Sequence, residues 1–384
     1  MTVEAPVAIV GGGPVGLALA LALHARDVPA RTFERRADAK SGSRSIGVHP
    51  PSLELLAQLG LVDRFLARGV RVRRGIAFGR GGPLGVMDFG SCPGSYPFIL
   101  SIPQEETESI LREALETRAP GALVVADAES LVADGRGVTL RLVARPGAAA
   151  REERASVVVG ADGKSSRVRA ALDLGFDGGA YPGAYVMGDF PDTTRFGDDA
   201  AVFLHPRGLV ESFPLPGRVR RWVVRLGAED EPSPDQLVAA VLERTRHRLV
   251  AGDAHRTSAF RAERYLARAL ARGRIALAGD AAHVVSPIGG QGMNLGWLGA
   301  RSLADTLASI VRDGADAERS LRRDAAARRR IARATARRAE VNMWLGRPVP
   351  HPWARERAVE GLLASPARLV LARMFTMRGL GLGV

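Results

Sequence analysis

The hydrophobic and polar positions near the N-terminus change from one periodicity to another. A continuous apolar run at 7–10 predicts a buried strand, and after a group of glycines the helical spacing of apolar positions at 14–26 predicts a helix. A short apolar run at 30–34 predicts a second strand. Strand, tight turn, helix and strand in this order indicate a βαβ unit.

The next part of the chain mixes helical and strand patterns. The segment 51–66 begins with proline and carries leucines at helical spacing, which predicts one helix, and 104–118 predicts a second, amphipathic helix. The glycine-rich stretch 70–89 favours a hairpin. Alternating apolar positions at 123–143 and 155–159 predict further strands.

From residue 181 to residue 226 the pattern becomes rich in strands separated by proline and glycine turns. The runs 201–205, 209–213 and 221–226 predict strands of a second sheet, which we expect to belong to a different lobe. The remainder follows a simpler order: a helix at 234–250, a buried strand at 275–278, a helix at 292–312, and further helix interrupted by prolines near 350.

Length and cysteine content set limits on the class of protein. A chain of 384 residues is long enough for two lobes. Cys92 is the only cysteine, so no intramolecular disulfide can form. No run of about eighteen apolar residues suggests a membrane span, and strand-like sequence begins too early for a signal peptide. We therefore expect a cytoplasmic protein without a membrane span.

The formal charge of +13 raises the alternative of a nucleic-acid partner. Lys40 and Lys164 are the only lysines, so arginine supplies nearly all of the positive charge. The basic stretch 322–338 falls on a predicted alanine-rich helix and has no nucleic-acid motif beside it, which favours a solvated helix face. The seven histidines lie far apart in the sequence, so we expect no metal site.

The first motif is the GxGxxG sequence at 11–16, between the first strand and the first helix. Gly11 permits a tight turn, Gly13 lets a pyrophosphate approach the backbone, and Gly16 lets the helix lie close to the strand. The helix N-terminus offers unpaired N–H groups and the positive end of its dipole to phosphates. In a βαβ unit this pattern favours dinucleotide binding over a purely structural glycine turn.

Glu34 ends the second strand of this unit. A carboxylate at that position can accept hydrogen bonds from both ribose hydroxyls of an adenosine, and it would repel a 2′-phosphate. The tightly held nucleotide is therefore expected to be FAD or NAD rather than NADP.

Two more motifs follow apolar strands. In the first, the run at 158–161 leads into Asp162-Gly163 and then into a helix, for which a simple capped turn is an equal alternative. In the second, the strand at 275–278 leads to Asp280, and a glycine-rich loop at 287–292 then opens a helix. Asp280 can bind a polyol hydroxyl, and the helix N-terminus can stabilise negative charge on a ring N–C=O group.

Together these motifs resemble the para-hydroxybenzoate hydroxylase family of class A FAD-dependent monooxygenases. The resemblance covers nearly the whole chain, with the motifs in the family's order. It implies an α/β fold with a Rossmann-like FAD-binding domain of the GR2 type, an interleaved β-sheet substrate domain and C-terminal helices. The implied FAD-binding domain comprises 1–70, 98–175 and 256–340. The implied substrate domain comprises 71–97 and 176–255, and 341–384 is the C-terminal helical segment.

The resemblance also implies tightly but non-covalently bound FAD and transient docking of NADH or NADPH, in which Asp162 takes part. Arg44 would face the FAD, Gln104 and Arg112 would contact it, and Asp280 would bind the ribityl chain. The residues expected to hold FAD are Gly11, Gly13, Gly16, Glu34, Arg35, Arg44, Gln104, Arg112, Asp162, Asp280, Pro287, Gly289, Gly290, Gly292, Met293 and Asn294.

The implied reaction is hydroxylation of a small aromatic or polycyclic substrate with NAD(P)H and O₂ through a flavin C4a-hydroperoxide, in secondary metabolism or aromatic degradation. Such chemistry needs a dry cavity, and we expect the sheet at 181–226 to roof it. Phe203, Phe213 and Trp222 are candidate substrate contacts, with sheet core as the alternative role. His205, Arg225 and Pro287 are the catalytic candidates; His205 either activates a phenol or caps a turn.

Two other enzyme classes share this fold. Flavin-dependent halogenases carry a Trp-x-Trp-x-Ile-Pro segment, whereas the tryptophans here are isolated from one another. Prenyl-chain reductases use reduced flavin on a C=C bond without O₂ and are the main alternative. Hydroxylation of an aromatic substrate is the function that the sequence favours.

Overall fold

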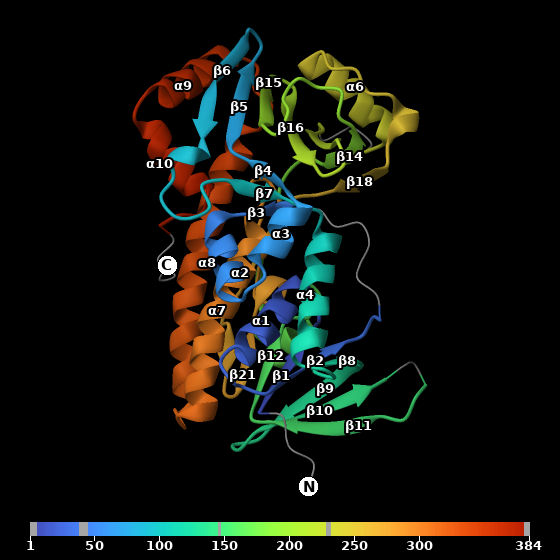
Figure 1. The fold of residues 1–384 in the computed structure, drawn as a ribbon, viewed down its shortest axis with the longest axis vertical. Coiled ribbons are helices and arrows are strands. Elements are labelled where there is room, and N and C mark those ends of the chain that lie inside the picture. Colours follow the sequence, from blue (N-terminus) through green and yellow to red (C-terminus); the bar gives the residue numbers. More distant parts are fainter. Residues whose placement is uncertain (1–5, 38–44, 145–146, 228–231, 380–384) are drawn as a thin grey trace.

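The computed structural model describes residues 6–37, 45–144, 147–227 and 232–379 (Figure 1). Two large sheets lie toward opposite ends of the long axis, with two long helices beside the lower sheet and two shorter C-terminal helices beside the upper one. No helix within the described ranges is both long and apolar enough to cross a bilayer.

The lower lobe in Figure 1 is built on a six-stranded sheet in the order β20-β21-β12-β1-β2-β8. Its strands are β1 (Val7–Val10), β2 (Ala30–Glu34), β8 (Leu123–Val125), β12 (Val157–Gly160), β20 (Ala271–Arg272) and β21 (Ile275–Leu277). All neighbouring strands are parallel except β20 and β21. This is the parallel sheet that a βαβ sequence pattern predicts.

Helices cover one face of this sheet. They are α1 (Pro14–His24), α4 (Gln104–Arg118) and α7 (Gln291–Arg312), and α8 (Ala317–Leu345) lies beside α7. Successive β1 residues point to opposite faces, so Val7 and Ile9 pack with the helices. Ala8 and Val10 pack instead with a three-stranded sheet of β9 (Asp127–Ala133), β10 (Val138–Val143) and β11 (Arg151–Ala155). Both faces of β1 are therefore buried, which explains its uninterrupted apolar sequence.

The upper lobe is a seven-stranded sheet in the order β18-β14-β17-β16-β15-β5-β6. Its strands are β5 (Arg74–Gly79), β6 (Gly82–Asp88), β14 (Tyr185–Pro191), β15 (Ala200–His205), β16 (Gly208–Leu215), β17 (Val219–Arg225) and β18 (Arg256–Phe260). Helix α6 (Pro234–Thr245) covers one face. The other face is turned toward the lower lobe and carries much of the site described below.

Short elements connect the two lobes. Two more three-stranded sheets contain β3 (Gly47–Val48), β4 (Val70–Val72) and β7 (Ile99–Ser101), and β13 (Phe176–Ala180), β19 (Glu263–Ala267) and β22 (His283–Val284). The remaining helices are α2 (Pro50–Gln58), α3 (Val62–Arg68), α5 (Arg167–Ala171), α9 (Trp353–Ala364) and α10 (Ala367–Phe375). Single 3-10 turns are η1 (Phe89–Ser91), η2 (Ala251–Asp253) and η3 (Gly279–Ala281).

Two predicted helices were wrong in extent. The segment 51–66 is two helices, α2 and α3, because the chain turns at Gly60, whose φ of +65° ends the first of them. The helix predicted to reach residue 250 ends at Thr245, where Arg246 adopts a left-handed φ of +60°. The apolar periodicity continued past both ends and did not reveal these turns.

The proposed domain boundaries stay a prediction, but two strands pair across them and one helix contains a boundary. β13 was assigned to the substrate domain, but it pairs with β19, a strand that was assigned to the FAD-binding domain. β18 was assigned to the FAD-binding domain and pairs with β14 in the seven-stranded sheet. The proposed boundary after residue 340 falls inside α8. Strand pairing between distant segments decides these assignments, and a single sequence does not show it.

Candidate active site

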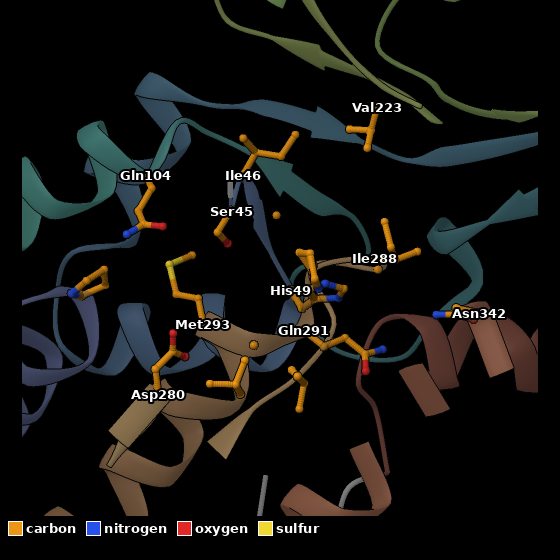
Figure 2. A pocket seen from close by; sticks show the side chains of 18 of the residues that line it. Ser45, Ile46, His49, Gln104, Val223, Asp280, Ile288, Gln291, Met293 and Asn342 are labelled. Carbon is orange, nitrogen blue, oxygen red and sulfur yellow. The ribbon is translucent and has the colours of Figure 1, made fainter. Parts of the chain in front are cut away.

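One continuous cavity of about 1180 Å³ connects the two lobes. Its lining includes the glycine turn after β1, the segment after β12, the segment after β21 and the loop before α7. These segments lie far apart in the sequence and meet because parallel strands deliver their carboxyl ends to one edge of the sheet. Figure 2 shows Asp280, Met293 and Gln104 around one part of this cavity and Ile288 and Val223 around another.

Of the three motif glycines in the turn after β1, only Gly13 has space beside it for a side chain. A Cβ on Gly11 would lie 2.3 Å from the Ala161 carbonyl oxygen, and one on Gly16 would lie 1.9 Å from the Gly11 carbonyl oxygen. A Cβ on Gly13 would meet no atom within 4 Å, and Gly13 lines the cavity. Gly11 and Gly16 therefore serve close packing, whereas Gly13 leaves backbone open to the approach of a phosphate.

The start of α1 is suited to an anion. Gly13 is its N-cap and Pro14 its first residue, and within the described part of the chain no side-chain cap is formed there. The N-terminal end of a helix carries partial positive charge. A pyrophosphate placed beside Gly13 would meet these groups.

Glu34 is fixed beside this turn. One carboxylate oxygen accepts a hydrogen bond from the Gly12 backbone N–H at 2.8 Å, and the other accepts one from the Arg36 N–H at 3.1 Å. A carboxylate has about four acceptor positions, so Glu34 can still accept from ribose hydroxyls. Arg35 and Arg36 also line the cavity, and the sequence analysis had singled out only Arg35.

Asp162 holds the backbone that follows β12. Its Oδ2 accepts hydrogen bonds from the N–H groups of Arg167 at 2.7 Å and Val168 at 3.2 Å. Its Oδ1 is buried without a hydrogen-bond partner among the described residues. Buried carboxylate oxygens are seldom left unsatisfied, so this atom fits a donor supplied by a bound molecule. Asp162 can therefore cap the turn through Oδ2 and still bind a ligand through Oδ1.

Asp280 and the loop before α7 complete this half of the cavity. Asp280 lies on the turn η3 and points into the cavity (Figure 2). Gly289 and Gly290 have φ values of +93° and +65°, which residues with a side chain rarely adopt. Gly290 is the N-cap of α7, whose first N–H groups receive no side-chain cap. The cavity-lining residues of this loop include Pro287, Gly289, Gly290, Gly292 and Met293.

Asn294, the last residue of the segment predicted to face the flavin, is not among the residues that line the cavity. Its Oδ1 accepts from the His49 N–H at 2.8 Å, and its Nδ2 donates to the carbonyls of Gly47 and Gly290, both at 2.8 Å. Asn294 therefore fixes the glycine loop against the strand β3. It points inward because it lies on the buried side of the first turn of α7.

His49 was not singled out from the sequence, although it lines the cavity beside this loop. It is almost fully buried, and burial lowers its pKa to about 4, so the imidazole is neutral at pH 7. Its Nδ1 has no hydrogen-bond partner among the described residues. The Nδ1 atom of His49 could therefore form a hydrogen bond with a ring bound in the cavity.

The remaining predicted FAD contacts, Gln104, Arg112 and Arg44, differ in where they lie relative to the cavity. Gln104 lines the cavity, and its Nε2 donates to Glu108 Oε1 at 2.6 Å. Arg112, two turns further along α4, does not line it. Arg44 lies outside the described residues, although its neighbour Ser45 lines the cavity.

The seven-stranded sheet roofs the other half of the cavity. The side chains that face it from β15, β16 and β17 include Val202, Leu204, Leu209, Glu211, Phe213, Arg221 and Val223. Helices α9 and α10 add Val359, Leu363 and Phe375. With few exceptions this lining is apolar, as a pocket for an aromatic molecule requires.

Two of the predicted substrate contacts do not face the cavity. Phe203 and Trp222 pack under α6 on the opposite face of the sheet, where Phe203 stacks on Phe78 at 4.7 Å between ring centres. Alternate strand residues point to opposite faces, and Phe213 falls on the cavity side. The bulk of these side chains suggested a pocket, whereas strand register decided their direction.

His205 and Arg225, predicted as catalytic candidates, do not line the cavity either. The His205 Nδ1 accepts from the Arg207 N–H at 3.3 Å, so His205 takes the alternative role of supporting a turn. Arg225 donates to the carbonyls of Met343 and Pro182, both at 3.2 Å. Of the three catalytic candidates, only Pro287 borders the cavity.

Comparison with known proteins agrees with this geometry. A family model described as FAD binding domain matches residues 4–339. The chain belongs to this family, and FAD is its cofactor. The family and the α/β fold that the motifs implied are thereby confirmed.

The relatives include several monooxygenases. 6-Methylpretetramide 4-monooxygenase of Streptomyces rimosus is 35% identical over 322 residues, which cover 81% of this chain and 57% of that protein. Pentachlorophenol 4-monooxygenase of Sphingobium chlorophenolicum is 32% identical over 331 residues, which cover 80% of this chain and 59% of that protein. The chain thus spans less than two thirds of the length of these two relatives.

A solved structure matches over a greater share of its length. The crystal structure of p-nitrophenol 4-monooxygenase from Pseudomonas putida DLL-E4 superposes with a TM-score of 0.84 and 25% identity. The match covers 97% of each chain.

Replacing Asp280 with alanine should weaken FAD binding while leaving the fold intact, because the side chain faces the cavity and not the core. Loss of hydrogen bonds to a carboxylate should lower the affinity roughly ten- to hundredfold. Fluorescence titration of the stripped protein with FAD measures this change. Asp235→Ala, on the exposed start of α6, is the matched control. An Asp280→Ala protein that binds FAD as tightly as wild type would refute this role.

Proposed function

We propose that this protein is an FAD-dependent monooxygenase that uses NAD(P)H and O₂ to hydroxylate a small aromatic or polycyclic substrate. Support for this proposal comes from the continuous cavity, in which the polar segments around Gly13, Glu34 and Asp280 adjoin an apolar chamber under the seven-stranded sheet. Two of the relatives are named for pentachlorophenol and p-nitrophenol, which supports an aromatic substrate. We place the activity in secondary metabolism or aromatic degradation, in the cytoplasm.

Residues in the lower half of the cavity would bind FAD, and those under the seven-stranded sheet would enclose the substrate. Gly13, Glu34 and Asp162 would hold the adenosine diphosphate part of FAD, and Asp280 its ribityl chain. Bound FAD would supply the redox chemistry, taking electrons from NAD(P)H and using them to activate O₂. The uncapped N–H groups at the start of α7 would stabilise negative charge on a ring placed beside them.

The roof and the C-terminal helices would keep water from the reacting ring. Val223 and Phe213 on the sheet and Leu363 on α9 present apolar surface to the same chamber. A reactive oxygen species formed there would survive longer than in water. The chamber therefore favours oxygen transfer to the substrate over release of peroxide.

The test is oxygen consumption by the FAD-loaded protein with NADH or NADPH and a panel of phenols, indoles and polycyclic aromatics. We expect an aromatic substrate to accelerate NAD(P)H oxidation, with uptake of O₂ and formation of a hydroxylated product of 16 mass units more. NAD(P)H oxidation that reduces a substrate C=C bond without O₂ would instead indicate a reductase. Unchanged oxidation with every aromatic compound and no product would contradict the proposal.

A further inference from the structure

Glu211 is the one acidic side chain on the cavity face of β16. Leu209, Glu211 and Phe213 alternate toward the cavity along this strand. Glu211 has only 6% of its surface exposed. The sequence Gly-Leu-Val-Glu-Ser-Phe at 208–213 contains this lone carboxylate within a predicted strand, but nothing in the pattern showed which face it would take.

The neighbours of Glu211 on the roof are apolar. Val202 on β15 and Val223 on β17 lie directly opposite it in the sheet, and both line the cavity. Figure 2 shows Val223 across the chamber from His49 and Ile288, which marks the space that Glu211 borders. Among the described residues, none donates a hydrogen bond to the Glu211 carboxylate or forms an ion pair with it.

The nearby charged groups have other partners. Arg221 on β17 binds the Asp189 carboxylate with two hydrogen bonds of 2.6 and 2.7 Å. Arg225, further along β17, donates to backbone carbonyls. Tyr185 on β14 donates its hydroxyl to the Met343 sulfur at 3.4 Å. The Glu211 carboxylate is therefore left for a molecule inside the cavity.

Glu211 is also the group in this chamber that changes charge near neutral pH. Burial raises its pKa to about 7. Burial raises the pKa of Tyr185 beyond the physiological range and lowers that of His49 to about 4, so neither titrates near pH 7. A carboxylate in an apolar wall destabilises the fold unless it is paired, and side chains with strongly perturbed pKa values cluster at functional sites.

We propose that Glu211 binds the phenolic hydroxyl of the substrate and accepts its proton during hydroxylation. This inference rests on the proposed function and specifies the substrate class: a hydroxylated aromatic compound that carries no carboxylate near this end. A carboxylate group on the substrate would be repelled by the ionised Glu211 carboxylate.

The proton transfer is balanced within the proposed reaction. The phenolic O–H bond breaks, its electron pair stays on the phenolic oxygen, and the proton forms a new O–H bond with a carboxylate oxygen of Glu211. No further oxidant is needed beyond that of the monooxygenase reaction. A base whose proton affinity matches the working pH is well suited to this step.

The experiment measures binding of three probes to the FAD-loaded protein through the change in flavin absorbance. The probes are 2-naphthol, 2-methoxynaphthalene, which lacks the O–H donor, and 2-naphthoate, which carries a carboxylate. Each is titrated between about pH 5 and 8 against wild type, Glu211→Gln, Glu211→Leu and Glu152→Gln. Glu152 is exposed on β11 and does not line the cavity, so its variant is the matched control.

For wild type and Glu152→Gln we expect 2-naphthol to bind about tenfold more tightly than 2-methoxynaphthalene, and 2-naphthoate to bind least. The affinity for 2-naphthol should rise with pH through about 7, because the ionised form of Glu211 is the stronger acceptor. Glu211→Gln keeps an acceptor but should lose this pH dependence. Glu211→Leu should lose the preference for 2-naphthol.

Equal binding of 2-naphthol and 2-methoxynaphthalene to wild type would overturn this inference and leave the proposed function standing. So would an unchanged preference in Glu211→Leu, or a pH dependence that persists in Glu211→Gln. Failure of all three probes to bind would count against both the inference and the proposed function. The FAD absorbance of each variant shows that its fold is retained.

Discussion

Replacing Gly13 with valine is expected to give a folded protein that no longer retains FAD. Gly13 has extended backbone angles, φ −77° and ψ −176°, which valine adopts readily. A Cβ there would meet no protein atom within 4 Å. The added methyl groups would instead fill the space where a pyrophosphate must approach the start of α1. We expect the affinity for FAD to fall at least about 100-fold, or about 2.7 kcal/mol.

The matched control is Gly179→Val in β13, where a Cβ would also meet no atom within 4 Å. Both variants should melt within a few degrees of the wild-type apoprotein, and only Gly179→Val should purify yellow. Isothermal titration with FAD gives the affinities. A Gly13→Val protein that binds FAD like wild type would place the pyrophosphate elsewhere.

Replacing Glu34 with arginine should have a second large effect on FAD retention. The change removes the acceptor of the Gly12 N–H and places a third cation beside Arg35 and Arg36. A buried N–H left without its acceptor costs about 1–3 kcal/mol, and the ribose loses its acceptor as well. We expect FAD affinity to fall by about 100-fold or more.

Glu152→Arg makes the same change of charge on an exposed strand and should leave FAD affinity unaltered. Glu34→Gln should lie between wild type and Glu34→Arg, because an amide oxygen still accepts one hydrogen bond while its NH₂ group cannot. The quantity to compare is the FAD dissociation constant of each purified apoprotein. Equal affinities for Glu34→Arg and wild type would remove Glu34 from the ribose site.

Much of the fold could be predicted from the sequence because its local signals are strong. The apolar run at 7–10, the glycines after it and Glu34 predict one βαβ unit, and the structure contains it. The helix predicted at 104–118 is confirmed as α4. Pairing between distant strands was harder, since nothing in β13 or β18 indicates the partner strand.

The dinucleotide half of the site was easier to predict than the substrate half. Backbone geometry requires glycine or a carboxylate at fixed points of a βαβ unit, so Gly13 and Glu34 are visible as motifs. The substrate chamber has no such constraint. Its lining depends on which face of β15, β16 and β17 turns inward, and a shift of one residue exchanges Trp222 for Val223 and Ser212 for Glu211.

His49 shows a different limit. It follows the short strand β3 and reaches the cavity because Asn294, far along the chain, binds its backbone N–H. No local pattern marks such a contact. A site residue of this kind can be identified only from the three-dimensional structure, in which the two distant segments lie together.

The central claim is that segments distant in the sequence surround one FAD whose ring opens into the aromatic chamber. A crystal structure of the FAD-loaded protein tests it most directly. We expect the pyrophosphate beside Gly13, the ribityl chain beside Asp280 and the flavin ring at the glycine loop 287–292, next to the chamber that Glu211 borders. FAD bound away from Gly13 and Asp280, or with its ring turned away from this chamber, would show that the proposed site is wrong.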